Sequence, residues 1–394
     1  MDESKRDVGS SVHDGVGHVN ATKPREVDGN GRDPPVDEMK RDVGSSVHDG
    51  VGHVNYMNRR KVDGSGTSSV GDWRLEDELS KMILEGILED LQGDRGDSRL
   101  LSPVVTRSAS SVNRHIRDEH IIFQEAAHRY ILHPGTDMEA VFPISVSGLW
   151  ARYFEEFDAE AVTKQWFDDW AVKQWSPYFA VIREYRERGE SDEQIARRIR
   201  DAWREKGLIA SAAGTRMHRN IELALGGELY DGRSREMTMF RSFVSEWLEP
   251  REWRVYRLEW AIYCSQAMVA GQIDAIFVRD GEYYMVDWKR CSKPLDDQRS
   301  FRDQRGRCPL ESLRDNTCNH YFVQQNLYAA ILERRYSIYV SRMWLCQIHP
   351  DYESYRLIAV PELREQAGKI LDQTAVGRTV MMPWETQLPV HDMG

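Results

Sequence analysis

The chain has 394 residues, a formal net charge of −11 and 40% hydrophobic residues, which is enough apolar material for one large domain or two modest ones. That charge excludes a protein that coats nucleic acid through bulk positive charge, but it allows an enzyme whose basic residues gather in one groove. No apolar stretch approaches the ~20 residues of a membrane span, so no membrane partner is expected.

The first 29 residues lack the apolar segment of a secretory signal. The five cysteines are odd in number and scattered along the chain: Cys264, Cys291, Cys308, Cys318 and Cys346. Both features predict an intracellular protein in a reducing compartment, with a nuclear or mitochondrial destination left open.

Residues 1–71 are predicted to be a disordered tail that contains a duplicated segment. Asp2–Asn20 recurs as Asp37–Asn55, with Ser4 replaced by Met39 as the single difference. Both copies are rich in Gly, Asp, Ser and His and offer little to bury. Residues 72–118 follow as a short helix and linker, because apolar residues recur every fourth position over Trp73–Leu91.

Residues 119–375 are predicted to form one folded domain, with a helical part at 119–213, a catalytic core at 214–375 and a tail at 376–394. Extended pieces are expected near His128–Tyr130 and Ile144–Ser147, and helix from Trp150 to Tyr185. A capping box begins at Ser191, and the helix after it presents a row of arginines: Arg197, Arg198, Arg200 and Arg204. Such a row is typical of a solvated face, and phosphate binding is the alternative.

The core reads as helix, three-strand meander, helix and strands, which predicts an α/β fold with a mixed central sheet flanked by helices. Helices are expected at Thr215–Leu225, Glu236–Leu248, His320–Arg334 and from Glu362. Strands are expected at Trp253–Tyr263, Met268–Arg279, Tyr283–Lys289, Tyr339–Ile348 and Ser354–Val360.

Asp280-Gly281 lies between two apolar runs, which is the strongest short signal for a two-residue hairpin. Counting inward from that turn sets Asp274 directly opposite Asp287, with their Cβ atoms about 5 Å apart. Lys289 is two residues beyond Asp287, so strand alternation places it on the same face. Two facing carboxylates require a cation, and with the lysine they suit metal-dependent hydrolysis of a phosphodiester. A solvated strand face and a register-breaking bulge are the alternatives.

Other polar residues at helical or strand positions join this group. His218 precedes Glu222 by four residues and shares its helix face, and Glu259 interrupts an apolar strand. Gln324 and Tyr328 are again four residues apart on one helix.

In this order, the motifs Gly214-Thr215-x-x-His218, Glu259, Gly271-x-x-Asp274, Asp287-x-Lys289 and Gln324-x-x-x-Tyr328 form one series. The series resembles the signature of the PD-(D/E)XK nuclease superfamily in its RecB-like exonuclease branch. The upstream segments around Tyr130 and Ser145 look similar to the viral and phage-type members. The resemblance covers about residues 120–372 and implies a restriction-endonuclease-like core with a helical N-terminal elaboration.

Position by position, the resemblance implies that Asp274, Asp287, His218 and the backbone carbonyl of Trp288 are metal ligands. Lys289 would orient or activate the attacking water and stabilise charge on phosphorus. The resemblance further implies a catalytic or second-metal role for Glu259 and contacts with the nucleic-acid strand for Gln324 and Tyr328.

Oxygen-rich ligation favours Mg²⁺ or Mn²⁺ as the cofactor. Some RecB-like enzymes hold an iron–sulfur cluster through clustered cysteines. This chain departs from that pattern, so no such cluster is expected. A zinc site built from Cys291, Cys308, Cys318 and His320 is a minor alternative, because the spacing is irregular.

The segment from Lys289 to Arg307 is predicted to grip the phosphate backbone, because it holds seven basic against three acidic residues. Its candidate nucleic-acid contacts are Arg290, Lys293 and Arg302. A flexible, solvated loop is the alternative.

The expected function is therefore Mg²⁺-dependent cleavage of DNA, exonucleolytic or flap-type, in DNA repair, recombination or replication. A helicase partner would supply any unwinding, since the chain has no phosphate-binding loop of the G-x-x-x-x-G-K-[ST] type. The alternatives are a catalytically silent nucleic-acid-binding module with the same fold and an RNA nuclease.

Overall fold

A computed structural model of the chain describes residues 113–124, 127, 129–136, 139–142, 144–300 and 303–375. The predicted tails, the predicted helix at Trp73–Leu91, His128 and Arg302 lie outside these residues. Within the described part, no helix is both long enough and apolar enough to cross a membrane.

The main sheet has six strands, and its mixed pairing is the one that the sequence predicts. β5 (Arg254–Cys264), β6 (Val269–Arg279) and β7 (Glu282–Lys289) form the antiparallel meander. β8 (Val340–Gln347) runs parallel to β7, and β9 (Arg356–Ala359) returns antiparallel to β8. Each predicted strand of the core begins and ends within two residues of its observed position.

The two-residue strand β4 (Ile144–Ser145) pairs with β6 at Val269 and Ala270, on the side that β7 occupies farther along. β7 pairs with β6 only from Ala275 onward. On this side of β6 the ladder is therefore interrupted between the two partners, over residues 271–274.

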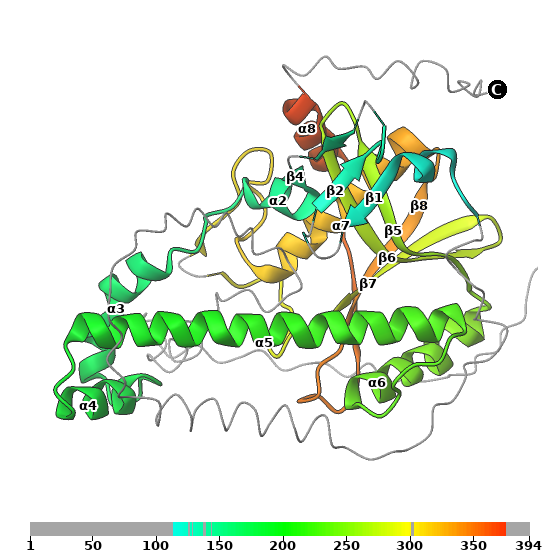
Figure 1. The fold of residues 1–394 in the computed structure, drawn as a ribbon. Coiled ribbons are helices and arrows are strands. Elements are labelled where there is room, and N and C mark those ends of the chain that lie inside the picture. The colour runs from blue at the N-terminus through cyan, green and yellow to red at the C-terminus, as the bar shows by residue number, and fades with distance from the viewer. Residues whose placement is uncertain are drawn as a thin grey trace, which may run out of the picture.

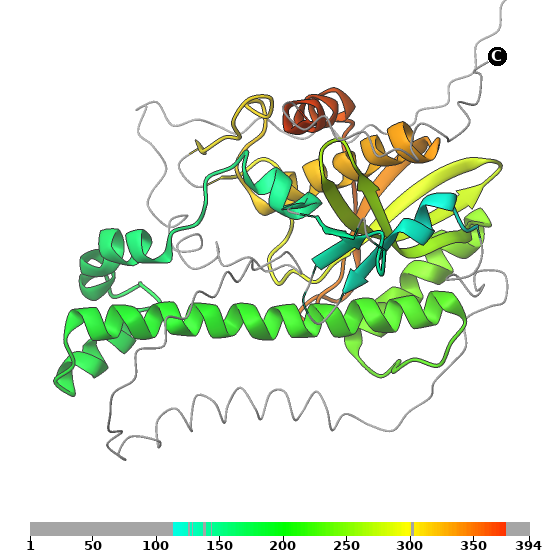
Figure 2. The same cartoon turned by 45° about the horizontal axis from the view of Figure 1, so that its top comes forward.

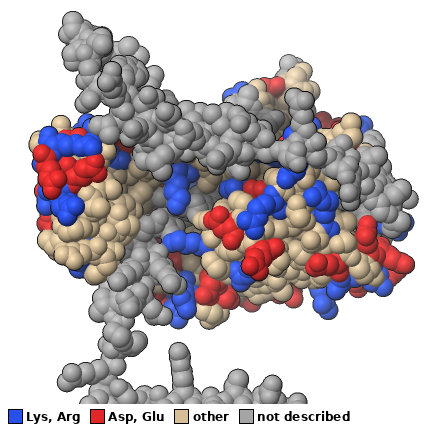
Figure 3. All heavy atoms as spheres, turned by 90° about the horizontal axis from the view of Figure 1, so that it is seen from below, with Lys and Arg blue, Asp and Glu red and all other residues tan. Residues whose placement is uncertain are grey.

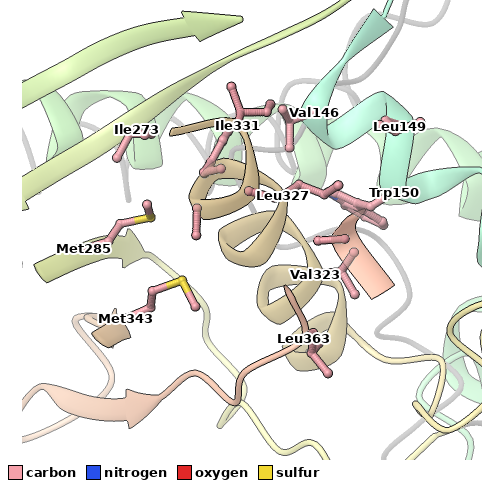
Figure 4. Close-up of a cluster of buried hydrophobic side chains, with 14 of the residues drawn as sticks. Val146, Leu149, Trp150, Ile273, Met285, Val323, Leu327, Ile331, Met343 and Leu363 are labelled. Atoms are coloured by element: carbon pink, nitrogen blue, oxygen red, sulfur yellow. The ribbon is translucent and has the colours of Figure 1, made fainter. Parts of the chain in front are cut away.

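α7 (Thr317–Tyr336) connects the parallel strands β7 and β8 and is the central helix of the core. It is buried on almost all sides, as expected for a helix with apolar residues around most of its circumference. Figure 4 shows Val323, Leu327 and Ile331 of this helix packed between α2 (Val146–Ala151) and the sheet residues Met285 and Met343. α8 (Arg364–Ala375) packs on its outer side.

A second, three-stranded sheet precedes the main one. It consists of β1 (Ile121–Gln124), β2 (Arg129–Leu132) and β3 (Ala140–Val141), all antiparallel, and it follows a short 3₁₀ helix at Ile116–His120. Tyr130, Leu132 and Phe142 pack this sheet against Tyr263 and Ala270 of the main sheet.

α5 (Asp192–Gly226) is a single helix of 35 residues that runs beneath the sheets (Figures 1 and 2). α3 (Ala159–Val172) and α4 (Phe179–Glu187) pack on its N-terminal end, away from the sheet. Its C-terminal end lies beside α6 (Arg235–Phe243), whose last turn continues as a π-helix at Val244–Leu248 and a 3₁₀ turn at Glu249–Arg251.

The predicted capping box at Ser191 is confirmed, since its side chain and that of Gln194 each accept a backbone N–H of the other residue. The prediction of a separate helix at Thr215–Leu225 is wrong, because that segment continues α5 without a break. Gly214 is helical and buried, and the helix ends only at Gly227, which has a left-handed φ of 77°. The predicted boundary at 213/214 therefore falls inside one helix.

Candidate metal centre

The hairpin between β6 and β7 has the predicted turn and register. Asp280 and Gly281 have positive φ angles of 51° and 82°, as a tight turn that matches the strand twist requires. Arg279 pairs with Glu282, and the ladder continues inward to Ala275 and Val286. One further step in the same register sets Asp274 opposite Asp287.

Asp274 lies where the ladder of β6 is interrupted. Its carboxylate Oδ2 accepts the backbone N–H of Trp288 at 2.8 Å, so a side chain replaces the next backbone acceptor. This hydrogen bond holds the Asp274 carboxylate at the edge of β7, beside Asp287.

Glu259 is the corresponding residue on β5. Leu258 pairs with Ala275 and Trp260 with Ile273, so Glu259 lies opposite Asp274 in register. Its φ is +42°, an uncommon conformation for a residue other than glycine in the middle of a strand. Leu258 and Trp260 pack into different apolar clusters, so the alternation of the strand is broken at Glu259. Such local irregularities are typical of functional sites.

His218 approaches the same point from α5. Its Nδ1 is 3.5 Å from Oδ2 of Asp274. Ligand atoms of His218, Glu259 and Asp274 all lie within 4.8 Å of one another. Ligands of one octahedral Mg²⁺ lie ~3.0 Å apart when adjacent and ~4.2 Å apart when opposite, so the three residues would move closer together around a divalent cation.

Lys289 completes the centre from the end of β7. Its Nζ is 2.5 Å from Oδ2 of Asp287, which confirms the predicted common face, and both side chains are almost fully buried. The ammonium also donates to Oε1 of Gln324 at 3.4 Å. Gln324 in turn donates to the hydroxyl of Tyr328 at 3.1 Å. The two α7 residues therefore lie inside the site beside the lysine, and their contact with a nucleic-acid strand stays a prediction.

Two contributions to this arrangement were not predicted. The ring of Tyr321, one helical turn before Gln324, lies 4.3 Å from the Lys289 ammonium. Gly271 lets Tyr328 approach, because a Cβ at this position would lie 2.6 Å from Tyr328 Cε1 and 3.0 Å from a Val146 methyl. The three-residue spacing of Tyr321 and Gln324 is a signal that could have identified the former.

Burial makes the negative charge of this centre costly. It raises the pKa of Asp274 to about 6, against the opposing effects of Lys289 and the Trp288 N–H. It also raises the pKa of Asp287 to about 6, where Lys289 opposes the shift and Asp274 adds to it. The pKa of Glu259 is raised well above its ordinary value by burial and by the neighbouring carboxylates of Asp274 and Glu222. A divalent cation would relieve these costs together.

The pKa values of the two basic groups, His218 and Lys289, shift in opposite directions. Burial, and then the nearby Lys289, lower the pKa of His218 to about 4, so its imidazole is neutral at pH 7 and can serve as a ligand. For Lys289, burial favours the neutral amine. The carboxylates of Asp287 and Asp274 outweigh it, and the net pKa is raised.

The basic segment after β7 is more neutralised than the sequence suggests. Arg290 pairs with Glu236 at 2.9 Å, Arg299 lies 3.4 Å from Asp296, and Arg305 lies 3.6 Å from Asp303. Lys293 is exposed. Its described residues make several contacts, because Arg305 forms a β-bridge with Arg314 and the Asn316 side chain donates to the carbonyls of residues 297 and 299.

Three of the four arginines in the predicted row on α5 are also paired with acids. Arg198 lies 2.7 Å from Glu190, and Arg200 lies 3.0 Å from Glu193. Arg204 is 2.5 Å from Asp201. Figure 3 shows Lys and Arg interspersed with Asp and Glu over the face of the molecule seen from below. These contacts favour the predicted solvated face over phosphate binding.

Comparisons with known proteins leave the family open. No protein-family model and no curated protein matches the chain. A solved structure titled "Crystal structure of SSO0001" is similar at 16% identity with a TM-score of 0.17, and the match covers 30% of this chain. The chain matches about half of that structure (46%), and at this TM-score the similarity assigns neither a fold nor a function.

Proposed function

We propose that the chain is a divalent-metal-dependent nuclease that hydrolyses phosphodiester bonds of DNA, with a restriction-endonuclease-like core of the PD-(D/E)XK type. The observation that supports it is a single one: His218, Glu259 and Asp274 offer three ligand atoms within 4.8 Å, beside the buried pair of Asp287 and Lys289. Two antiparallel strand pairings and two helices converge to build this centre, which a solvated strand face would not need.

The donor set fits Mg²⁺ or Mn²⁺, with carboxylate oxygens in the majority and one neutral imidazole. His218, Glu259 and Asp274 would hold the cation, and Asp287 would complete the set once its charge is shared with Lys289. Bound there, the cation supplies a water of lowered pKa and neutralises charge at the phosphate.

Lys289 acts in this proposal as a fixed positive donor. Its raised pKa keeps the ammonium protonated at pH 7, so it does not act as a general base in the metal-free site. Asp287, Gln324 and the ring of Tyr321 hold it in place. From there it donates to a non-bridging phosphate oxygen, and its charge stabilises the charge that develops as the bond to phosphorus forms.

The test is cleavage of end-labelled oligonucleotides of one sequence, offered as single-stranded DNA, duplex DNA, a 5′ or 3′ flap and RNA. Each is incubated with Mg²⁺, with Mn²⁺ and with chelator, using the wild-type protein and the Asp274→Asn variant. The proposal predicts metal-dependent products from DNA that the variant does not form. If only RNA is cleaved, the protein is an RNA nuclease. The metal site allows this outcome, because none of its residues distinguishes ribose from deoxyribose. No cleavage together with no metal effect on melting would identify a silent module.

A further inference from the structure

The ladder between β5 and β6 changes faces at Glu259. Leu258 and its partner Ala275 pack into one apolar cluster. Two residues farther along, Trp260 and its partner Ile273 pack into another. In an uninterrupted ladder both pairs would lie on the same face, because side chains alternate with a period of two. One residue stands opposite one residue at this point, so the change is not a bulge, and the two strands turn over together.

The backbone of Glu259 makes this reversal. Its φ of +42° costs free energy in a residue other than glycine, and such a conformation persists only where surrounding contacts hold it. One of these contacts comes from β6, where the Nε2 amide of Gln272 donates to the backbone carbonyl of Glu259 at 3.3 Å. Gln272 therefore stabilises the turned backbone at Glu259.

The length of the Gln272 side chain explains why it reaches that carbonyl. Gln272 pairs with Ala261, which is two residues from Glu259 along β5. Diagonal neighbours of this kind are ~7–8 Å apart, a distance that a long side chain spans and a short one does not. The side chain is half-buried, so its hydrogen bond is partly shielded from water. The motif Gly271-x-x-Asp274 assigns no role to this position.

We propose that Gln272 is a positioning residue of the metal centre, whose amide fixes the backbone of Glu259 and thereby directs the Glu259 carboxylate toward the cation. This inference rests on the proposed function, in which Glu259 is one of the residues that hold the metal. In the observed conformation, a carboxylate oxygen of Glu259 lies within 4.8 Å of ligand atoms of His218 and Asp274. Relaxation of the backbone to an ordinary strand conformation would turn that carboxylate away from the other two ligands.

The experiment replaces Gln272 by methionine, which keeps the length of the side chain and removes the donor. Gln373→Met is the matched control, because Gln373 lies on α8 and its amide accepts the hydroxyl of Tyr153 at 3.1 Å. Mn²⁺ binding to the folded, metal-free proteins is measured by calorimetric titration, and melting without metal is recorded beside it. We expect Gln272→Met to raise the Kd for Mn²⁺ about tenfold or more, as for other residues that hold metal ligands in place. Gln272→Asn, whose amide is one methylene shorter, should behave in the same way, and Gln373→Met should bind like the wild type.

The same substitution in a Glu259→Gly background shows whether Gln272 acts through Glu259. Glycine adopts positive φ without strain and has no carboxylate, while His218, Asp274 and Asp287 remain as ligands. The weaker binding of this background is followed at millimolar Mn²⁺. We expect Gln272→Met to cause no further loss of Mn²⁺ affinity there, because the ligand that it positions is already absent.

Two outcomes would overturn the inference while leaving the nuclease proposal in place. In the first, Gln272→Met binds Mn²⁺ like the wild type, whatever its melting temperature, so the residue supports only the fold. In the second, Gln272→Met loses the same factor of affinity with and without the Glu259 carboxylate, so the amide contacts the cation or its water directly. A wild-type protein that binds no Mn²⁺ contradicts the proposed metal centre itself.

Discussion

The buried centre and the helical end of the molecule handle charge in opposite ways. At the N-terminal end of α5, Arg198, Arg200 and Arg204 each lie beside an acid. At the centre, Glu259, Asp274 and Asp287 are withdrawn from water, and Lys289 pairs with Asp287. Both regions have acids and bases within a few ångströms of one another, yet positive and negative charges balance only on α5.

The charged pairs on α5 stabilise the folded state slightly, whereas the buried acids of the centre lower its stability. Exposed pairs contribute about 0–1 kcal/mol each and are tolerant to change. Buried acids without enough cations destabilise the folded state, and such groups cluster at functional sites. The imbalance therefore supports the proposal that a positive ligand binds at the centre.

The largest expected effect is that of Lys289→Ala. Removing the ammonium should lower cleavage by at least about 10²-fold, the range seen when one transition-state donor is lost. Asp287 would be left buried without its partner, so we also expect a lower melting temperature without metal. Activity and melting are measured together, and near-normal cleavage would contradict the assigned role.

Gly271→Ala tests the packing that supports the centre. The new methyl would overlap Tyr328, whose Cε1 lies 2.6 Å away, and press on Val146. Overpacking of this kind costs about 1–3 kcal/mol. Because Tyr328 is hydrogen-bonded to Gln324, we expect cleavage to fall as well. Gly281→Asn at the hairpin turn serves as the control, since nothing lies within 4 Å of a Cβ there and asparagine tolerates positive φ. Equal melting of the two variants would argue against the contact.

The pH dependence of stability tests the buried acids. The pKa of Asp274 is raised to about 6, so the folded state binds its proton more tightly than the unfolded chain does. The loss of folding stability caused by the ionised Asp274 is fully present above pH 7 and disappears as the pH falls through 6 toward 4. His218 opposes this trend. Its pKa is lowered to about 4, so the unfolded chain binds its proton more tightly, and the folded state loses stability as the pH falls below 6.5.

The comparison of wild type with Asp274→Asn, both metal-free, isolates the acid. We expect the variant to be more stable at pH 8 by on the order of 1–3 kcal/mol, with a smaller difference at pH 5. Denaturant unfolding at the two pH values measures it. A difference that grows toward pH 5 has the wrong sign for a raised pKa.

The smallest effect is expected at the surface. Arg198→Ala removes a pair whose arginine side chain is 46% exposed. Stability should change by no more than about 1 kcal/mol, with cleavage unaltered. A clear loss of DNA binding in this variant would show that the charges of α5 reach the substrate.

The meander and its turn could be predicted because local rules decide them. Asp280-Gly281 requires positive φ at both positions, and the apolar alternation then fixes which residues face each other. That count alone placed Asp274 opposite Asp287 and Lys289 beside Asp287. The capping box at Ser191 is equally local and was equally readable.

Features set by tertiary contacts could not be read. The continuation of α5 through Gly214 depends on packing at both ends of the helix, at Trp203 in one cluster and Met217 in another. Arg290 pairs with Glu236, which is far from it in the sequence, so no count of charges along the loop could show this pair. The reversed alternation at Glu259, and the convergence of His218 on it, likewise require the three-dimensional structure.

The central claim is that the buried acids form a binding site for a divalent cation. Calorimetric titration of metal-free wild type with Mn²⁺ tests it most directly, alongside Asp274→Asn and the surface variant Arg198→Ala. The account predicts saturable binding with a rise in melting temperature in wild type and Arg198→Ala, and neither effect in Asp274→Asn. Equal heats and equal melting for all three proteins would contradict it.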